Sequence, residues 1–361
     1  MLQRLGTKFF TLISFLIPCF SFGQNLSAYT DYKDCFIVYD NEITKQIEYL
    51  PVKSFQVGGN CIAYIDNVDA FKVYYAGETI PLLDVPPQFY SATDDLLIYL
   101  INGQLFVFDN KTTVPLTYYA NAYSVGDSII AFTDKNFSTL RVYYNGEIKE
   151  IENKGTSDPV QSMKTGDNIL AYVDYNNYFK IFYHNEVKQK EEFQPVSYQA
   201  GNNIVSYIDG NTQLFKVFYS GKDYKIDNLP PQSYQTGDDM VAYVDNDGRF
   251  KVFYNGAAVD IAATAPDFYK IEDNILVYGN AYEFKVFYKG TITSLENYIP
   301  ENYKIDYNTL AYIDRYGILK ALSNGKLVQV DREKVADFIL SRDVIQYSNS
   351  MNRIKFFSNG K

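Results

Sequence analysis

The chain repeats one pattern ten times along its length, and this repeat constrains the fold more than any single residue does. Its clearest copy begins at Ser233 and ends at Gly256, where SYQTGDDMVAYVD is followed, after a short gap, by FKVFYNG. The aromatic residue near the centre of the pattern recurs at spacings of 33 to 40 residues. It occupies Tyr29, Tyr64, Tyr99, Phe132, Tyr172, Tyr207, Tyr243, Tyr278, Tyr312 and Tyr347. The sequence therefore predicts one repeat architecture for essentially the whole chain.

Each copy contains four short extended segments, which we name a to d in chain order. In the clearest copy, segment a begins at Ser233, segment b centres on Tyr243 and segment c begins at Phe250. Segment d is a polar run. Gly-Asp pairs separate a from b, and Asn-Gly pairs separate c from d; both pairs tolerate positive φ and predict tight antiparallel hairpins. The link from d to the next a is longer and usually carries proline, as at Pro230-Pro231.

The apolar pattern of these segments favours an all-β propeller over a stacked β-solenoid. Segments b and c are apolar on both faces, so their sheet must lie between neighbouring sheets, whereas the charged segment d suits an outer edge. The N-terminus supplies b, c and d (residues 26–50), and the C-terminus supplies a, b and c (residues 337–359). We therefore expect a single propeller of about nine four-stranded blades, with a range of eight to ten. Both termini should close the ring by sharing a blade.

The strand pattern resembles a known repeat superfamily. A Gly-Asp-Asn turn, an apolar b strand that ends in Asp and an aromatic c strand that ends in Asn-Gly are similar to the blades of TolB-like and WD-repeat propellers. The resemblance covers residues 25–361 in strand order only. The chain lacks the Trp-Asp and Gly-His pairs and the Ser-Pro-Asp-Gly turn of those blades. No functional residue is carried over from these families.

The first residues have the composition of a secretory signal peptide. Arg4 and Lys8 precede an apolar run over residues 9–22, and small residues then mark a cleavage site. We assign residues 1–23 to the signal peptide and residues 24–361 to the propeller domain. No later stretch has the ~18 consecutive apolar residues of a spanning helix, so no transmembrane segment is expected. The predicted location is the periplasm, the extracellular space or the cell surface.

Three cysteines bear on export and on disulfide formation. Cys19 lies in a loose lipobox, which leaves a lipoprotein as an alternative, although the preceding Pro18 argues against it. Cys35 and Cys61 stand where other copies carry Phe179 and Ile169, so both are expected to be small, buried, unpaired hydrophobic residues. A bridge between them is the alternative that an oxidising compartment permits.

Composition excludes several kinds of function. The 33 Lys and Arg residues against 43 Asp and Glu residues give a net charge of −10, which repels phosphate backbones, so no nucleic acid partner is expected. The single histidine, His184, lies in a c-to-d turn, so neither a zinc site nor a histidine-based triad can be built around it. We expect no cofactor.

Carboxylates are the remaining candidates for catalysis or metal binding. Those at the ends of the b segments recur in most copies, which favours turn capping over a unique catalytic pair. They are Asp31, Asp66, Asp134, Asp174, Asp209, Asp245 and Asp314. The run from Asp245 to Gly248 resembles part of a calcium loop, but Gly256 stands where that loop needs its bidentate acid. We expect no metal site and no catalysis.

These inferences predict an exported, non-catalytic binding or scaffolding module for a protein, peptide or glycan. The b-to-c and d-to-a loops share the end of the propeller that carries the length changes, and binding residues tend to lie on such loops. Non-consensus residues there are the candidate ligand contacts: Asn176, Asn211, Asp247, Arg249, Tyr282, Arg315 and Tyr316. The alternatives are a carbohydrate-active enzyme, either a glycosidase or a lyase, and a structural subunit of a cell-envelope complex.

Overall fold

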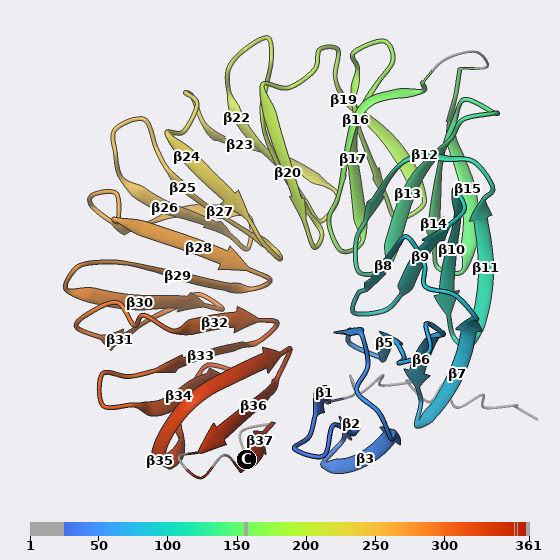
Figure 1. The fold of residues 1–361 in the computed structure, drawn as a ribbon. Helices are drawn as coiled ribbons and strands as arrows, with labels where there is room; N and C mark the ends of the chain where they lie inside the picture. Colours follow the sequence, from blue (N-terminus) through green and yellow to red (C-terminus); the bar gives the residue numbers. More distant parts are fainter. Residues whose placement is uncertain (1–24, 155–157, 350, 352, 359–361) are drawn as a thin grey trace, which may run out of the picture.

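The protein is an all-β ring of sheets. The computed structural model describes residues 25–154, 158–349, 351 and 353–358, and within them the chain forms 37 strands and no helix. These strands form nine hydrogen-bonded sheets around a central axis (Figure 1). Seven of the sheets contain four strands in chain order, which confirms the predicted four-stranded blade.

Short connections join the strands throughout the described residues. The first half contains β1 (Leu26–Thr30), β2 (Phe36–Asp40), β3 (Ile43–Glu48), β4 (Ser54–Val57), β5 (Cys61–Ile65), β6 (Phe71–Tyr75), β7 (Glu78–Leu83), β8 (Phe89–Ala92), β9 (Leu97–Ile101), β10 (Gln104–Asp109), β11 (Thr112–Thr117), β12 (Ala120–Val125), β13 (Ile129–Asp134), β14 (Thr139–Tyr144), β15 (Glu147–Asn153), β16 (Val160–Thr165), β17 (Ile169–Asp174), β18 (Phe179–Tyr183) and β19 (Glu186–Glu191). The second half contains β20 (Ser197–Gly201), β21 (Ile204–Ile208), β22 (Phe215–Tyr219), β23 (Lys222–Asp227), β24 (Ser233–Thr236), β25 (Met240–Val244), β26 (Phe250–Tyr254), β27 (Ala257–Ala262), β28 (Phe268–Glu272), β29 (Ile275–Asn280), β30 (Glu283–Tyr288), β31 (Thr291–Glu296), β32 (Tyr303–Asp306), β33 (Thr309–Ile313), β34 (Ile318–Ser323), β35 (Lys326–Ser341), β36 (Val344–Asn349) and β37 (Ile354–Phe357).

The sheet β24–β27 shows why this repeat forms a blade. Every residue of β25 is buried, and so are Phe250, Val252 and Phe253 of β26, because both faces of these strands pack against neighbouring sheets. The outer strand β27 is mostly exposed. Between β26 and β27, Asn255 and Gly256 have φ values of 50° and 80°, so this hairpin has the two left-handed residues that the Asn-Gly pair predicts.

The two ends of the chain close the ring, as predicted. The predicted sharing of one blade is wrong, because the terminal fragments remain separate sheets: β1–β3 and the last part of the six-stranded sheet β32–β37. They pack against each other through side chains. The Tyr39 ring stacks on Phe356 with 4.2 Å between centroids, and the Ser27 hydroxyl donates to Gln346 at 3.0 Å. In Figure 1 the blue β1–β3 and the red β36 and β37 lie next to each other.

The strand β35 explains why this ring can be counted in two ways. It continues for 16 residues, pairs first with β34 and then with β36, and so takes part in two consecutive blades. Counting the six-stranded sheet once gives nine blades, and counting it as two gives ten. Both numbers lie within the predicted range of eight to ten.

The aspartates that follow the b strands cap turns, as the sequence predicts. We call them the strand-end aspartates: Asp31, Asp66, Asp134, Asp174, Asp209, Asp245 and Asp314. In the sheet β16–β19, Asp174 accepts hydrogen bonds from the backbone N–H groups of Asn176 and Tyr178 at 2.8 and 2.9 Å. Its other oxygen pairs with Lys180 at 2.8 Å, and Lys180 also reaches Glu152 of the preceding sheet at 2.7 Å. This aspartate therefore helps to join two blades.

One cysteine assignment from the sequence is wrong. Cys61 is buried at the start of β5, as predicted, and burial raises its pKa to about 12. Cys35 precedes β2, and the following residue, Phe36, takes the buried position that corresponds to Phe179. Cys35 is therefore partly exposed, because the register is shifted by one residue from the predicted one. Both thiols are free.

The N-terminal predictions concern residues that the structure does not describe. The predicted signal peptide over residues 1–23, with the lipobox alternative at Cys19, lies outside the described residues. Among the described residues, the chain forms no helix with the length and apolar content that a membrane crossing requires.

Candidate functional site

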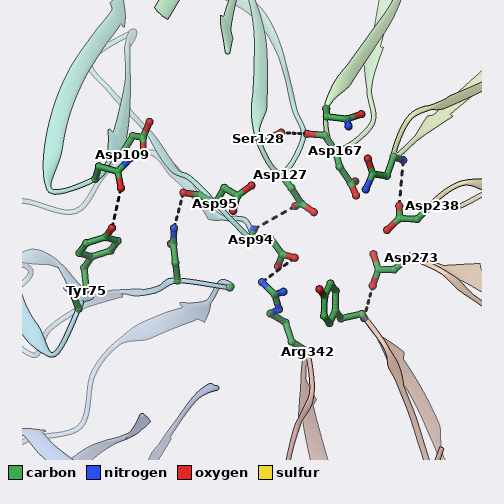
Figure 2. A pocket seen from close by; sticks show the side chains of 17 residues that line it. Tyr75, Asp94, Asp95, Asp109, Asp127, Ser128, Asp167, Asp238, Asp273 and Arg342 are labelled. Carbon is green, nitrogen blue, oxygen red and sulfur yellow. Dashed lines mark hydrogen bonds and ion pairs between the residues drawn. The ribbon is translucent and has the colours of Figure 1, made fainter. Parts of the chain in front are cut away.

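The turns between the a and b strands of nine consecutive blades meet at the axis and surround a pocket of about 720 Å³ (Figure 2). Five of these turns carry aspartate at the same position, which in the turn β16–β17 follows Gly166. We call these residues the axial ring: Asp94, Asp127, Asp167, Asp238 and Asp273. The equivalent positions in the other four turns are Gly59, Asn202, Tyr307 and Arg342. The repeat thus places one equivalent residue from each of nine blades around the pocket.

Glycine precedes several of these aspartates because the blades approach each other closely at the axis. A Cβ atom on Gly166 would lie 2.1 Å from the carbonyl oxygen of Gly201, and one on Gly201 would lie 2.0 Å from that of Gly237. The sequence analysis attributed these glycines to positive φ, and this explanation is wrong, because the glycines before the axial positions do not have positive φ. The left-handed residues of these turns are the later ones, such as Asn203 with φ 57° and Asp239 with φ 54°.

Hydrogen bonds between consecutive turns account for the recurring Gly-Asp-Asn motif. The Asp238 carboxylate accepts the backbone N–H of Asn202 in the preceding blade at 3.3 Å. The Asn168 side-chain amide donates to Asn203 at 2.9 Å, and the Asn203 backbone N–H donates back to the Asn168 side-chain oxygen at 2.9 Å. The same amide contact joins Asn274 to Asn308 at 2.9 Å. The motif therefore ties neighbouring blades together.

Arg342 is the one positively charged residue among the described residues that line the pocket. It lies in the β35–β36 turn, and its guanidinium pairs with the Asp94 carboxylate at 3.0 Å and covers the Tyr307 ring at 4.1 Å (Figure 2). A Cβ atom on Gly59 would lie 1.8 Å from this guanidinium, so glycine leaves the space through which Arg342 reaches Asp94. This contact joins the last blade to the third one.

The charge of the axial ring is poorly compensated. Burial is the main cause that raises the pKa of Asp94 to about 7, and the negative charge of Asp127 adds to it. The nearby Arg342 guanidinium lowers this pKa, but by less. Burial and the negative charges of Asp238 and Asp127 raise the pKa of Asp167. Burial also raises the pKa values of Asp127 and Asp273. Part of the ring is therefore protonated at neutral pH, and a cationic group that entered the pocket would favour its ionisation.

The described residues do not contain a group of three or more His, Cys, Asp or Glu side chains placed to hold a metal ion. The axial aspartates come from separate blades and several already accept backbone hydrogen bonds, so they face the pocket as a ring of separate carboxyl groups. This arrangement suits the electrostatic binding of a cationic group from a larger partner.

The seven candidate contacts from the sequence lie at the other end of the blades. Each belongs to a b-to-c connection, and the seven are spread over five such connections, outside the residues that line the pocket. Tyr282 and Tyr316 are 80% and 69% exposed. The backbone N–H groups of Asn176, Asn211 and Arg249 cap strand-end aspartates. Their role in binding stays a prediction.

The sequence analysis missed the axial ring although its motif was visible. The Gly-Asp pairs were interpreted as local turn chemistry only. The recurrence of Asp at one turn position in five blades was the signal, but it carries information only once the a-to-b turns are known to meet at the axis.

Comparisons with known proteins place the chain in a family. No curated protein matches the chain. Similar solved structures include the entire ectodomain of the receptor kinase CR4 from Physcomitrella patens, with 10% identity, 84% of this chain and 93% of that chain covered, and a TM-score of 0.37. The computationally designed Ika8 protein gives 14% identity, 85% and 96% coverage and a TM-score of 0.36. Prp20p from Saccharomyces cerevisiae gives 12% identity, 69% and 83% coverage and a TM-score of 0.35. Residues 20–361 match the model of the 10-bladed beta propeller domain, and the chain therefore belongs to that family.

Proposed function

We propose that this protein is an exported, non-catalytic β-propeller that binds or scaffolds a protein, peptide or glycan, and that its axial pocket receives a cationic group of the partner. The observation that carries the proposal is the pocket itself, which is lined by seven aspartates and by a single arginine that is already paired with one of them. A recess of this sign raises the local concentration of cationic ligands.

The repetition of the axial aspartates favours binding over catalysis. A catalytic pair is unique within a ring, whereas one aspartate recurs here at the same turn position of five blades. Asp127 and Asp238 also accept hydrogen bonds from the backbone of the preceding blade, so they have a structural task in the ring. The pocket is therefore better suited to holding a charge than to moving protons.

A direct test uses oligolysine as a defined cationic probe and isothermal titration calorimetry. We expect wild-type protein to bind it at low salt and to lose affinity as salt rises. Replacing two charges together, Asp127→Asn with Asp167→Asn, should weaken binding about tenfold, which corresponds to ~1.4 kcal/mol. The matched control is Asp69→Asn, in an exposed loop at the other end of the blades. Equal weakening by the control would contradict the assignment of the pocket.

The pH dependence of this binding has a defined sign. Because the pKa of Asp94 is raised to about 7 and the pKa values of the other ring members are raised as well, the ring gains negative charge as the pH increases from 5 to 8. Oligolysine keeps its charge over this interval. We therefore expect tighter binding at pH 8 than at pH 5 at constant ionic strength, and the opposite slope would contradict the proposal.

Export is part of the proposal and rests on the N-terminal sequence. Expression in a bacterium that secretes proteins, followed by cell fractionation and N-terminal sequencing, should recover a mature chain that begins at Gln24 outside the cytoplasm. Recovery of an uncleaved chain from the cytoplasm would refute export. A protein that co-purifies in a fixed ratio from the native envelope would instead favour the structural-subunit alternative.

A carbohydrate-active enzyme remains the second candidate because carboxyl groups with raised pKa values lie beside one another at the axis, and such groups cluster at active sites. A glycosidase of the usual kind would need one acid to protonate the leaving group and one carboxylate to act as base or nucleophile. Hydrolysis of a glycan panel by wild-type protein, together with its loss in Asp94→Asn but not in Asp69→Asn, would favour this alternative.

A further inference from the structure

A second recess lies at the opposite end of the blades from the axial pocket, between the sheets β8–β11 and β12–β15. It has a volume of about 380 Å³. Its lining comes from the β9–β10 turn, the β11–β12 connection and the residue that follows β13. We call it the tyrosine groove and define it by Asn102, Gln104, Tyr118, Tyr119 and Lys135.

The groove exists because two neighbouring connections depart from the repeat. The b-to-c connection of this blade is a two-residue turn, Asn102-Gly103, with φ values of 52° and 78°. The corresponding connection between β21 and β22 has six residues, from Asp209 to Leu214. The following d-to-a connection has only Tyr118 and Tyr119, where other blades use longer links that usually contain proline. The shortened turn leaves a hollow, and the tyrosines stand beside it.

Backbone hydrogen bonds hold the walls of the groove in place. The Ala120 N–H donates to the Gly103 carbonyl at 3.0 Å, and the Lys135 N–H donates to the Tyr119 carbonyl at 3.0 Å. The Tyr119 N–H donates to the Thr117 hydroxyl at 3.1 Å. These bonds join three connections into one preformed support, so less conformational entropy is lost when a ligand binds.

The side chains that line this support are accessible to a ligand. Tyr118 and Tyr119 remain 57% and 53% exposed. The side-chain amides of Asn102 and Gln104 and the ammonium of Lys135 make no hydrogen bond or ion pair with another described residue. Their donors and acceptors are free to contact a bound molecule.

We propose that the tyrosine groove binds a sugar ring of a neutral glycan. The apolar C–H face of a sugar can stack on a tyrosine ring, and its hydroxyl groups need partners that both donate and accept, as the Asn102 and Gln104 amides do. The groove contains no carboxylate, and the net charge of −10 opposes the approach of a polyanionic chain. The volume lies within the range of small-molecule sites. The inference rests on the proposed binding function and selects glycan as the ligand class, but it uses a site separate from the axial pocket.

The test is a binding panel of soluble neutral polysaccharides, namely a glucan, a mannan and a xylan, measured by calorimetry and by affinity electrophoresis with the mature protein. We expect at least one neutral polysaccharide to bind. Tyr118→Ala and Tyr119→Ala should weaken that binding tenfold or more, while Tyr118→Phe should retain most of it because the ring remains. The matched control, Tyr32→Ala, removes an exposed tyrosine from the β1–β2 connection, which is a b-to-c loop away from the groove, and should have no effect.

Three outcomes would overturn the inference. They are the absence of binding to every neutral polysaccharide, equal weakening by Tyr32→Ala, and preferential binding of a proline-rich peptide or an acidic polysaccharide to the groove. The double variant Asp127→Asn with Asp167→Asn separates this inference from the axial pocket. It should keep glycan binding while its oligolysine binding weakens about tenfold, so each site can fail independently of the other.

Discussion

The propeller contains two sets of repeated aspartates, the strand-end set and the axial set, and the fold shifts their pKa values in opposite directions. Most strand-end aspartates have little accessible surface, with Asp209 only 2% exposed, yet the pKa values of Asp66, Asp209, Asp245 and Asp314 are lowered. The axial aspartates keep more accessible surface, yet the surrounding turns enclose their carboxyl groups and raise their pKa values. Contact with solvent therefore does not decide the sign of the shift.

Partners account for this difference. Burial alone would raise the pKa of Asp209, but the Lys216 ammonium and two backbone N–H groups hold it below its ordinary value. Among the described residues no lysine lines the axial pocket, and the charged residues that do are aspartates and one arginine. The strand-end set is a compensated structural network, and the axial set is a charge excess at a recess. Both sets recur from blade to blade, as parts of the scaffold do. Within the described part of the chain, the axial set has negative charge that is not paired with lysine and could contact a ligand.

The largest expected effect comes from forcing the axial turns apart. Gly166→Ala places a methyl group against the Gly201 carbonyl oxygen, 2.1 Å from an ideal Cβ, and backbone cannot move aside easily. We expect the free energy of unfolding to fall by about 3 kcal/mol. Gly146→Ala is the control, because it lies at φ 80° with no heavy atom within 4 Å and should cost about 1 kcal/mol. Urea denaturation measures both, and equal losses would contradict the role of close approach.

The second prediction tests the ion pairs that lysines form with the strand-end aspartates. Lys216→Met removes the ammonium that pairs with Asp209 at 2.5 Å and Glu191 at 2.8 Å, and it leaves two carboxylates without their cation. We expect a loss of about 2 kcal/mol. Lys53→Met is the control, since the Lys53–Asp69 pair is about half exposed on both sides and should contribute less than ~0.5 kcal/mol. A large loss in the control, or none at Lys216, would show that these pairs do not differ as described.

The pH dependence of stability should separate the two sets. The pKa of Asp209 is lower in the folded protein than its ordinary value of 3.8, so its contribution is present above pH 3.8 and is lost as the pH falls further. The pKa of Asp94 is raised to about 7, so its protonated form favours folding below pH 3.8, and that contribution is lost as the pH rises toward 7. We expect maximal thermal stability between about pH 4 and 5.

One substitution tests whether the axial ring causes the loss of thermal stability as the pH rises. Asp167→Asn removes a group with a raised pKa, so it should increase Tm at pH 8 by about 1 to 2 °C and leave Tm at pH 4 unchanged. Differential scanning calorimetry at both pH values provides the comparison. An increase of the same size at both pH values would point to a cause other than charge repulsion.

The features that depend on local chemistry could be predicted from the sequence. The strand order, the left-handed Asn-Gly hairpins and the Asx turns of Asp174 and Asp245 each follow from a few neighbouring residues, and the structure confirms them. The Cys35 assignment failed because a one-residue shift moves a side chain to the other face of a strand. The propeller and its closure by both termini followed from the terminal fragments.

The candidate site could not be predicted in the same way. Arg342 and Asp94 lie far apart in the sequence, and their pairing at 3.0 Å depends on the absence of a side chain at Gly59. The tyrosine groove likewise depends on two shortened connections lying side by side. The sequence analysis considered the b-to-c and d-to-a loops as a variable surface, but it named residues in other blades.

The smallest expected effect concerns a gap in the compensated network. In four pairs of blades, a tyrosine of the b strand donates to a glutamate at or next to the end of the preceding d strand, at 2.8 to 3.2 Å; the tyrosines are Tyr64, Tyr172, Tyr207 and Tyr312. At the corresponding place the preceding strand β23 ends in Asp227, and the Tyr243 hydroxyl is buried with no hydrogen-bond partner among the described residues. In the last blade an aspartate does accept this hydrogen bond, since the Tyr347 hydroxyl donates to Asp331 at 3.1 Å, whereas Asp227 accepts the backbone N–H of Asn228 at 2.7 Å. Asp227→Glu should restore the missing contact and increase the free energy of unfolding by about 0.5 to 1 kcal/mol. On a Tyr243→Phe background the same change should not increase stability, because the new glutamate then has no hydroxyl group from which to accept a hydrogen bond. A double-mutant cycle by urea denaturation measures the coupling between the two residues. A stabilisation that persists without the hydroxyl would mean that Asp227→Glu acts through Lys251 instead, and that the strand-end network is held by charge alone.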